Sequence, residues 1–227
     1  MTTSTSSPPL SPTAAPRPVH ETMDAFKSLD GELLVAGVPL QRLAMRVGRT
    51  PFYAYDRPLL RARVESLRAA LPPEVQLHYA MKANPMPAVV GFMRGLVDGV
   101  DVASAGELKV ALDAGTAGAD ISFAGPGKTD SELIQAVGSD VLINVESERE
   151  IEFLAGLFTR TGLVARVAVR VNPDFELKGS GMKMGGGPKQ FGIDAEKVPD
   201  VLRRVGELDV DFEGFHIFSG SQNLDGK

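Results

Sequence analysis

The sequence predicts an α/β fold with parallel strands. Within that class it favours a TIM-type (β/α) barrel of which about six of the eight strands are present. From residue 77 onward, short apolar runs alternate with amphipathic segments at helical spacing. Three of these segments begin with Ser or Thr followed three residues later by Glu. The first five apolar runs begin roughly every 20–25 residues, which suits a barrel, and a doubly wound open sheet is the main competitor.

Six short apolar runs are expected to form the strands of this sheet. A long insertion, NPDFELKGSGMKMGGGPKQFG, delays the sixth run. No strand directly precedes its glycines, so a mobile active-site loop or a linker is expected there. The six runs are residues 76–82 (QLHYAMK), 99–104 (GVDVAS), 119–125 (ADISFAG), 140–146 (DVLINVE), 165–171 (ARVAVRV) and 211–218 (DFEGFHIF).

The segments between these runs carry the start and stop signals of helices. A helix is expected to follow Asp56, which suits an N-cap, and to end at Pro72. Three later helices begin with capping-box pairs, in which a hydroxyl and a carboxylate bind free backbone N–H groups. The pairs are Ser104 with Glu107, Thr129 with Glu132, and Ser147 with Glu150, and a further helix is expected within residues 194–206.

The chain before residue 57 is predicted to lie outside the barrel. Residues 1–18 are rich in Ser, Thr and Pro, and they are expected to be a disordered tail. Residues 19–56 are expected to form a separate N-terminal segment with a strand-like piece, a short helix and a strand at residues 51–55 (PFYAY). Residues 57–227 are assigned to the partial barrel.

The composition excludes several classes of function. The net charge of −5 gives no reason to expect nucleic acid as a partner. The chain has no cysteine, which rules out thiolate catalysis, fits a reducing compartment and leads us to expect a cytoplasmic protein. The three histidines, His20, His78 and His216, lie far apart, so no metal site is expected. No apolar run is long enough to span a membrane.

The stretch LHYAMKANP, residues 77–85, places a lysine at the end of a predicted strand. In barrels and in open α/β sheets, functional sites are built at the carboxyl ends of the strands. If Lys82 is backed by apolar residues there, its amine can be desolvated and become a usable nucleophile. The alternative is a lysine that only extends its amine to water, and the pattern alone favours this alternative.

Five motifs favour a functional role for Lys82, because together they resemble the fold-type III pyridoxal-phosphate (PLP) decarboxylases. This family contains diaminopimelate, ornithine and arginine decarboxylases, with alanine racemase as a more distant relative. Within it, the stretches MKMGGGPKQFG and FHIFSGSQNL most resemble the decarboxylases associated with exosortase systems. The five motifs, in the order of the family, are HYAMKANP (78–85), DVASAGEL (101–108), RVNPD (170–174), QFGI (190–193) and GFHIFSGSQ (214–222).

The resemblance implies a PLP-dependent decarboxylase with an alanine racemase-like barrel. Lys82 would hold PLP as a Schiff base, and His216 would lie against the face of its ring, so these two are the expected catalytic residues. Ser219 and Gly220 would help to hold the phosphate. The substrate would be an amino acid or an amino-acid derivative, free or bound to a carrier protein, and PLP would act as the electron sink.

Three further residues match positions near the cofactor in the family. Asp101 and Glu107 match acidic positions that line the pocket, and Arg170 matches an arginine near the ring. Each has a structural alternative, since Asp101 could face water, Glu107 could only cap its helix, and Arg170 could be an ordinary exposed strand residue. The resemblance also implies that Asn84 supports the loop of Lys82.

The sequence departs from the family in two ways. Gln190 stands where diaminopimelate and ornithine decarboxylases usually have Lys, and Phe218 stands where the diaminopimelate type has Gly, which weakens diaminopimelate as the substrate. The family's glycine-rich phosphate loop and C-terminal β-domain are not found. We therefore expect an N-terminal fragment that is inactive alone, whose residues 19–56 pack on that β-domain in a full-length homodimer.

Two other functions stay open from the sequence. A PLP-binding barrel without catalysis, like the PLP-homeostasis proteins, would share the lysine motif, although those proteins are complete barrels. A nucleotide-binding loop is a remote alternative, because SFAGPGKT, residues 122–129, differs by one residue from the G-x-x-x-x-G-K-[ST] pattern. In that alternative, Lys128 would contact phosphate.

Overall fold

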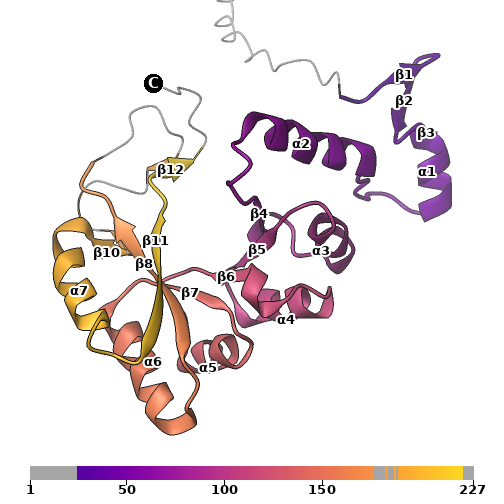
Figure 1. Cartoon of the computed structure of the whole chain (residues 1–227). Coiled ribbons are helices and arrows are strands. Elements are labelled where there is room, and N and C mark those ends of the chain that lie inside the picture. The colour runs from indigo at the N-terminus through magenta and orange to yellow at the C-terminus, as the bar shows by residue number, and fades with distance from the viewer. Residues whose placement is uncertain (1–24, 176–181, 184–186, 188, 222–227) are drawn as a thin grey trace, which may run out of the picture. The chain divides into compact units, whose positions relative to one another are not determined.

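A computed structural model describes residues 25–175, 182–183, 187 and 189–221. The chain divides between Leu59 and Leu60 into two compact units, which are described separately (Figure 1). None of the helices in these ranges has the length and apolar character needed to cross a bilayer. The tail expected at residues 1–18 lies outside the described residues.

The first unit contains a small antiparallel sheet followed by a helix. The strands β1 (Ser28–Leu29), β2 (Glu32–Val35) and β3 (Val38–Pro39) pair in chain order, and α1 (Leu40–Val47) follows. Both hairpins turn on two residues with positive φ, the second of which is glycine, as tight antiparallel turns require. The strand-like piece and the short helix expected in this region are therefore confirmed.

The strand predicted at residues 51–55 is wrong. These residues have no strand pairing, and the side chain of Tyr53 is 90% exposed. A short stretch rich in aromatic residues forms a strand only where a neighbouring strand and a buried face are available. Among the described residues of the first unit, no strand pairs with this segment.

The second unit is built on a parallel sheet that contains all six strands expected from the sequence (Figure 1). Each strand pairs in parallel with the next one of the six along the chain. Two short additions follow the insertion: β10 (Ile193–Asp194) pairs with the end of β8, and β12 (Gly220–Ser221) pairs with β9 (Met182–Lys183). The six strands are β4 (His78–Ala80), β5 (Gly99–Val102), β6 (Ile121–Phe123), β7 (Leu142–Val145), β8 (Ala165–Asn172) and β11 (Val210–Ile217).

One helix precedes the first strand of this sheet, and others occupy the connections between its consecutive strands. One of them, α3 (Pro87–Arg94), was not predicted, because its glycine and its short apolar run gave no clear helical start. Its first turn contains Pro87, whose fixed φ suits that position. The others agree with the sequence, and they are α2 (Arg57–Ala70), α4 (Ala105–Asp113), α5 (Asp130–Gly138), α6 (Glu148–Thr161) and α7 (Val198–Val205).

The capping signals mark the helix starts, but only one forms the complete reciprocal pair. Thr129 and Glu132 bind each other's backbone N–H at the start of α5. At α4, Glu107 instead accepts from the N–H of Ala103, one residue before the cap. The corresponding glutamate of α6, Glu150, likewise accepts from the residue before the cap. These two carboxylates therefore turn toward the ends of the preceding strands.

The hydrophobic core of the second unit lies between the sheet and the helices. Alternate strand residues face this side and are almost fully buried, such as Val100, Val102, Val167 and Val169. Each such burial stabilises the fold by about 1.5–3 kcal/mol. The residues between them face the opposite side, and near the strand ends many of these are polar: His78, Asp101, Ser122, Asn144, Arg170 and His216.

The sheet is curled into part of a barrel. In a flat sheet, the five spacings between the first and last of six strands would hold those strands about 24 Å apart. Yet Nζ of Lys82, just after β4, lies 5.6 Å from the ring centroid of Phe218, just after β11. The carboxyl ends of the two outer strands therefore approach each other, as the barrel prediction requires and an open sheet does not allow.

Candidate active site

The polar side chains of several strands meet at the carboxyl ends of the parallel sheet. The strand register places Ala80 beside Asp101, and Asp101 beside Ser122. At the opposite edge of the sheet, the register of β8 and β11 places Arg170 beside His216. Since the sheet is curled, these two groups face a common space, and His216 and Asp101 each affect the pKa of the other.

Lys82 lies in a tight turn at the end of β4. The buried side chain of Met81 anchors this turn, and Lys82 itself is exposed. Oδ1 of Asn84 accepts a hydrogen bond from the N–H of Met86 at 3.0 Å, and its carbonyl accepts one from the Tyr79 hydroxyl at 3.0 Å. The strand therefore ends in a turn that leaves the lysine exposed while Met81 stays in the core. In the described part of the chain, Lys82 forms no ion pair with a carboxylate.

Asp101 is held by two neighbours on the inner face of the sheet. The hydroxyl of Ser122 donates a hydrogen bond to Oδ1 of Asp101, and Nδ1 of His78 lies 3.6 Å from the same oxygen. Burial raises the pKa of Asp101, but His78 and Ser122 lower it by more, so it lies below its ordinary value. Asp101 therefore does not simply face water, because its carboxylate contacts Ser122 and His78.

The pair of His78 and Asp101 makes stability depend on pH in a defined direction. The Asp101 carboxylate raises the pKa of His78 above 6.5, so the stabilisation is complete below that pH and is lost as the pH rises through the folded-state pKa. It is also lost in acid, as the pH falls through the lowered pKa of Asp101. We expect His78→Gln to lower the free energy of unfolding by up to about 1 kcal/mol at pH 5.5, and by less at pH 9.

Urea unfolding of both proteins at the two pH values measures this difference, with Lys109→Gln as a control in an exposed ion pair. An effect of His78→Gln that is as large at pH 9 as at pH 5.5 would contradict the assignment.

Glu107 binds the start of its own helix. Its backbone N–H donates to the Ser104 hydroxyl at 3.2 Å, and its Oε2 accepts from the N–H of Ala103 at 2.7 Å. Since Ala103 directly follows β5, this carboxylate lies next to the end of the strand that carries Asp101. The capping role proposed as the alternative for Glu107 is observed, and its position also leaves it near the strand-end site.

Arg170 and His216 form the second half of the site, on β8 and β11. Arg170 is buried, and its Nη1 lies 2.8 Å from Oε1 of Glu146. This finding corrects the alternative of an exposed strand residue. His216 is half-buried, and its Nδ1 is buried without a hydrogen-bond partner among the described residues. Burial lowers the pKa of His216, and the positive charge of Arg170 lowers it further, so the imidazole is neutral at neutral pH.

Ser219 and Gly220 follow β11 at the same end of the sheet, and both are half-buried. Gly220 is paired with Lys183 in the short ladder of β9 and β12. This ladder brings part of the long insertion next to the turn that the sequence assigned to phosphate binding. Most of the glycine-rich loop, at residues 176–181, 184–186 and 188, lies outside the described residues.

Sequence reasoning missed a cluster of four buried charged side chains beside this site. We call Lys128, Glu146, Glu150 and Arg170 the buried ion network; each is at most 7% exposed. Glu150 had been explained as a helix-capping residue and Lys128 as part of a phosphate loop. The available signal was Glu146, a charged residue that directly follows an apolar strand and precedes the cap Ser147.

The nucleotide-binding alternative is not supported by the position of its lysine. Nζ of Lys128 lies 3.2 Å and 3.3 Å from the two carboxylate oxygens of Glu150, and it donates to the Gly125 carbonyl at 2.6 Å. Burial lowers the pKa of Lys128 and raises that of Glu150. A lysine whose donors are used inside the protein is not available to bind phosphate from solution.

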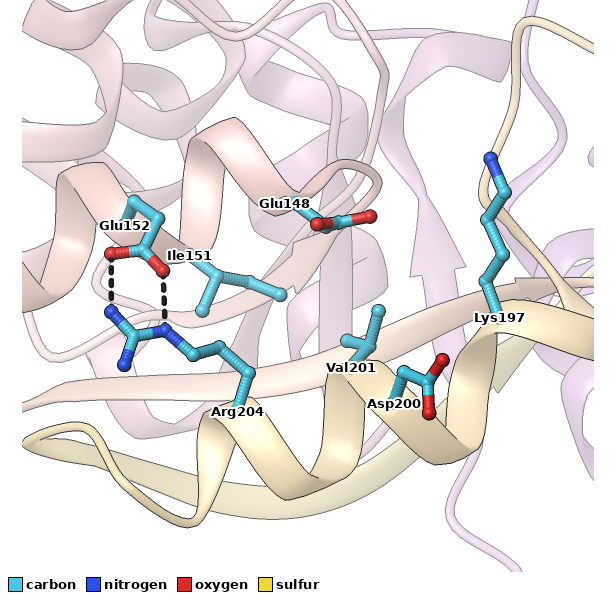
Figure 2. A pocket seen from close by; sticks show the side chains of 7 residues that line it. All are labelled: Glu148, Ile151, Glu152, Lys197, Asp200, Val201 and Arg204. Carbon is cyan, nitrogen blue, oxygen red and sulfur yellow. Dashed lines mark hydrogen bonds and ion pairs between the residues drawn. The ribbon is translucent and has the colours of Figure 1, made fainter.

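A groove of about 330 Å³ lies away from this site, between α6 and α7 on the outer side of the sheet (Figure 2). Its lining is largely ionic, and Glu152 and Arg204 form two hydrogen bonds of 2.6 Å and 2.9 Å with each other there (Figure 2). The strand-end residues do not line it. The Glu152–Arg204 pair joins the two helices across this groove.

Comparison with known proteins gives one family for most of the chain. Residues 58–227 match the family model described as the pyridoxal binding domain of pyridoxal-dependent decarboxylases. The chain is 40% identical over 177 residues to L-glutamyl-[BtrI acyl-carrier protein] decarboxylase of Niallia circulans, covering 77% of this chain and 41% of that protein. It is 39% identical over 203 residues to diaminopimelate decarboxylase of Aquifex aeolicus, covering 86% and 47%.

Solved structures give the same result. A diaminopimelate decarboxylase from M. jannaschii in co-complex with L-lysine superposes with a TM-score of 0.78 at 28% identity, over 89% of this chain and 49% of that chain. The enzyme of the same name from Helicobacter pylori gives a TM-score of 0.74 at 28% identity, over 82% and 48%. The chain thus spans about half the length of the relatives it matches.

Proposed function

Because the chain belongs to the pyridoxal-dependent decarboxylases, through their pyridoxal-binding domain, we propose that the protein removes carbon dioxide from an amino acid or an amino-acid derivative. Pyridoxal 5′-phosphate is the cofactor of this family. In the proposal, Lys82 and His216 are the catalytic residues. Asp101, Glu107, Arg170, Ser219 and Gly220 complete the set that holds the cofactor.

One observation carries the proposal: Lys82 lies just after β4, His216 lies on β11, and the carboxyl ends of these two outer strands approach each other. The Lys82 amine reaches within 5.6 Å of the Phe218 ring centroid, two residues beyond His216. It is exposed and forms no ion pair with the described carboxylates, so it is available to an aldehyde. The imidazole of His216 is half-buried, and its pKa is lowered by burial, so it can present a neutral ring to a group at the strand ends.

The residues present fit pyridoxal phosphate chemically. Lys82 supplies the amine that binds its aldehyde carbon. His216 supplies a neutral ring that can lie flat against an aromatic face, and its lowered pKa keeps charge out of that contact. Ser219 and Gly220 supply a hydroxyl and backbone N–H groups, which suit a phosphate. When bound, pyridoxal phosphate supplies an electron sink for the electron pair that the departing carboxylate leaves.

The proposal assigns the other polar residues to holding and orienting. The Asp101 carboxylate is ionised near neutral pH because its pKa is lowered, and it offers negative charge on the inner face of the sheet. Arg170 offers positive charge beside His216, fixed by Glu146. Opposite charges on the two sides of one space orient a polar cofactor in a single direction.

The substrate class rests on the relatives. One relative is named for a glutamyl group on an acyl-carrier protein, and several are named for diaminopimelate. Gln190 and Phe218 occupy positions where the diaminopimelate type usually differs, so we favour an amino-acid derivative other than diaminopimelate, including one bound to a carrier. The link to exosortase systems belongs to this proposal as well.

The N-terminal unit has a role outside the barrel in this proposal. It carries an open groove of about 760 Å³, lined by residues of β2, α1 and the loop at Thr50–Ala54. Apolar side chains such as Leu33 and Leu40 are exposed there. We propose that residues 19–56 pack on a β-domain of the intact enzyme. A cytoplasmic homodimer completes the proposal, and the absence of cysteine fits that compartment.

Measuring carbon dioxide release by the intact protein with added pyridoxal phosphate tests the function. The panel contains diaminopimelate, ornithine, arginine, lysine, free glutamate and glutamyl carrier protein. We expect release from one member, dependent on the cofactor. Tight cofactor binding without release from any member would instead favour the non-catalytic pyridoxal-phosphate barrel.

A further inference from the structure

The buried ion network needs a physical reason to exist. Removing ionised groups from water costs several kcal/mol each, and apolar residues of similar volume often stabilise a core equally well. Four such groups nevertheless lie together beside the strand ends, each at least 93% buried. Stability alone does not explain this arrangement, whose hydrogen bonds also fix the geometry of several segments.

Glu146 connects three separate segments with one carboxylate. Its Oε1 accepts from the N–H of Gly125 at 2.6 Å and from Nη1 of Arg170 at 2.8 Å. Its Oε2 accepts from the N–H of Gly192 at 3.1 Å. These contacts join the turn after β6, the strand β8 and the turn before β10.

Lys128 and Glu150 hold the backbone on both sides of that carboxylate. Oε2 of Glu150 accepts from the N–H of Glu146 itself at 2.7 Å. Lys128 donates to the carbonyl of Gly125, the residue whose N–H contacts Glu146. The Lys128–Glu150 pair therefore fixes both the residue that carries the carboxylate and one of the donors that it binds.

These contacts together fix the position of the Arg170 side chain. Its guanidinium carbon lies 5.0 Å from the ring centroid of Phe191, so the group is held between that ring and Glu146. The ring is placed by Gly192, which has a φ of +75°, and a Cβ at that position would meet the Arg170 carbonyl at 3.0 Å. Arg170 is in turn the register partner of His216.

We propose that Glu146 is a positioning residue that orients Arg170 beside His216 and so shapes the cofactor pocket without touching the cofactor. Through the Gly192 contact, the same carboxylate links the QFG turn to the pocket. The Lys128–Glu150 pair supports Glu146 in this role. The inference rests on the proposed function, since it concerns the pocket that binds pyridoxal phosphate.

The test uses the intact protein, titrated with pyridoxal phosphate, and three single variants. Glu146→Gln removes the negative charge of the carboxylate and places an amide N–H₂ against N–H groups that need an acceptor. Phe191→Leu leaves Glu146 unchanged and removes the ring on the other side of Arg170. Glu148→Gln, at an exposed position two residues along the chain, is the matched control. The readouts are the dissociation constant of the cofactor, its visible circular dichroism and the melting temperature.

We expect Glu146→Gln to weaken cofactor binding about tenfold or more, as loss of a charge-assisted hydrogen bond does, and to change the visible circular dichroism. Phe191→Leu should change the same dichroism, and the double variant should bind about as well as the weaker single one, because both act through Arg170. Glu148→Gln should match the wild type.

Two results separate the possible failures. If the wild type does not bind pyridoxal phosphate, the proposed function fails before the inference is reached. If the wild type binds it and Glu146→Gln lowers only the melting temperature, with affinity and dichroism unchanged, Glu146 is a structural residue and the inference is overturned. If Glu146→Gln does not fold, an unchanged dichroism in Phe191→Leu overturns it instead.

Discussion

Replacing Lys82 by alanine is expected to abolish covalent capture of pyridoxal phosphate and to lower carbon dioxide release by about 1,000-fold or more. The lysine amine is the exposed nucleophile at the end of β4, and the described residues around it offer no other amine in that turn. Loss of the cofactor's visible absorbance band and a radiometric assay of carbon dioxide measure the two effects.

Two variants distinguish chemistry from charge at this position. Lys82→Arg keeps the positive charge but carries a guanidinium that stays protonated, so it should be as inactive as the alanine variant. Lys109→Ala removes an exposed lysine of α4, paired with Asp113, and should behave like the wild type. Near-normal turnover in Lys82→Ala would contradict the role of this lysine.

Replacing Lys128 by methionine is expected to have the largest effect on stability, about 3–5 kcal/mol of the free energy of unfolding. The change leaves the Glu150 carboxylate, whose side chain is 3% exposed, without its counter-charge. Part of the cost is relieved by protonation, since burial already raises the pKa of Glu150. The loss should therefore be smaller at pH 5 than at pH 8.

Chemical denaturation of single and double variants measures this effect. Adding Glu150→Gln to Lys128→Met should recover a substantial part of the stability, because no buried charge is left unpaired. Lys109→Met, in a pair whose side chains are 74% and 64% exposed, should cost no more than about 0.5 kcal/mol. Equal losses in the two lysine variants would contradict the buried pairing of Lys128.

The sheet could be predicted because its signals are local. Each strand is a short apolar run, three of the helices begin with a Ser or Thr cap, and Thr129 with Glu132 forms the predicted capping box. The helix α3 lacked such a signal, since no side chain caps its start. The strand at residues 51–55 was predicted from a short local stretch alone, and such a stretch does not say whether a partner strand exists.

The candidate site could be predicted only in part. The resemblance identified Lys82, Arg170 and His216, and the structure brings the last two together as register partners. The functions assigned to them stay predictions. The contacts of Glu146 could not be read from the sequence, because they join residues 21, 24 and 46 positions away. Long-range hydrogen bonds of this kind depend on how the strands align, which a local pattern does not specify.

Borohydride reduction of the protein after incubation with pyridoxal phosphate, followed by peptide mass mapping, is the most direct test that Lys82 holds the cofactor. Reduction fixes the cofactor on whichever amine holds it. We expect a phosphopyridoxyl group on the peptide that contains Lys82, with none formed at that position in Lys82→Ala. Labelling of other lysines with none at Lys82, or no labelling at all, would contradict it.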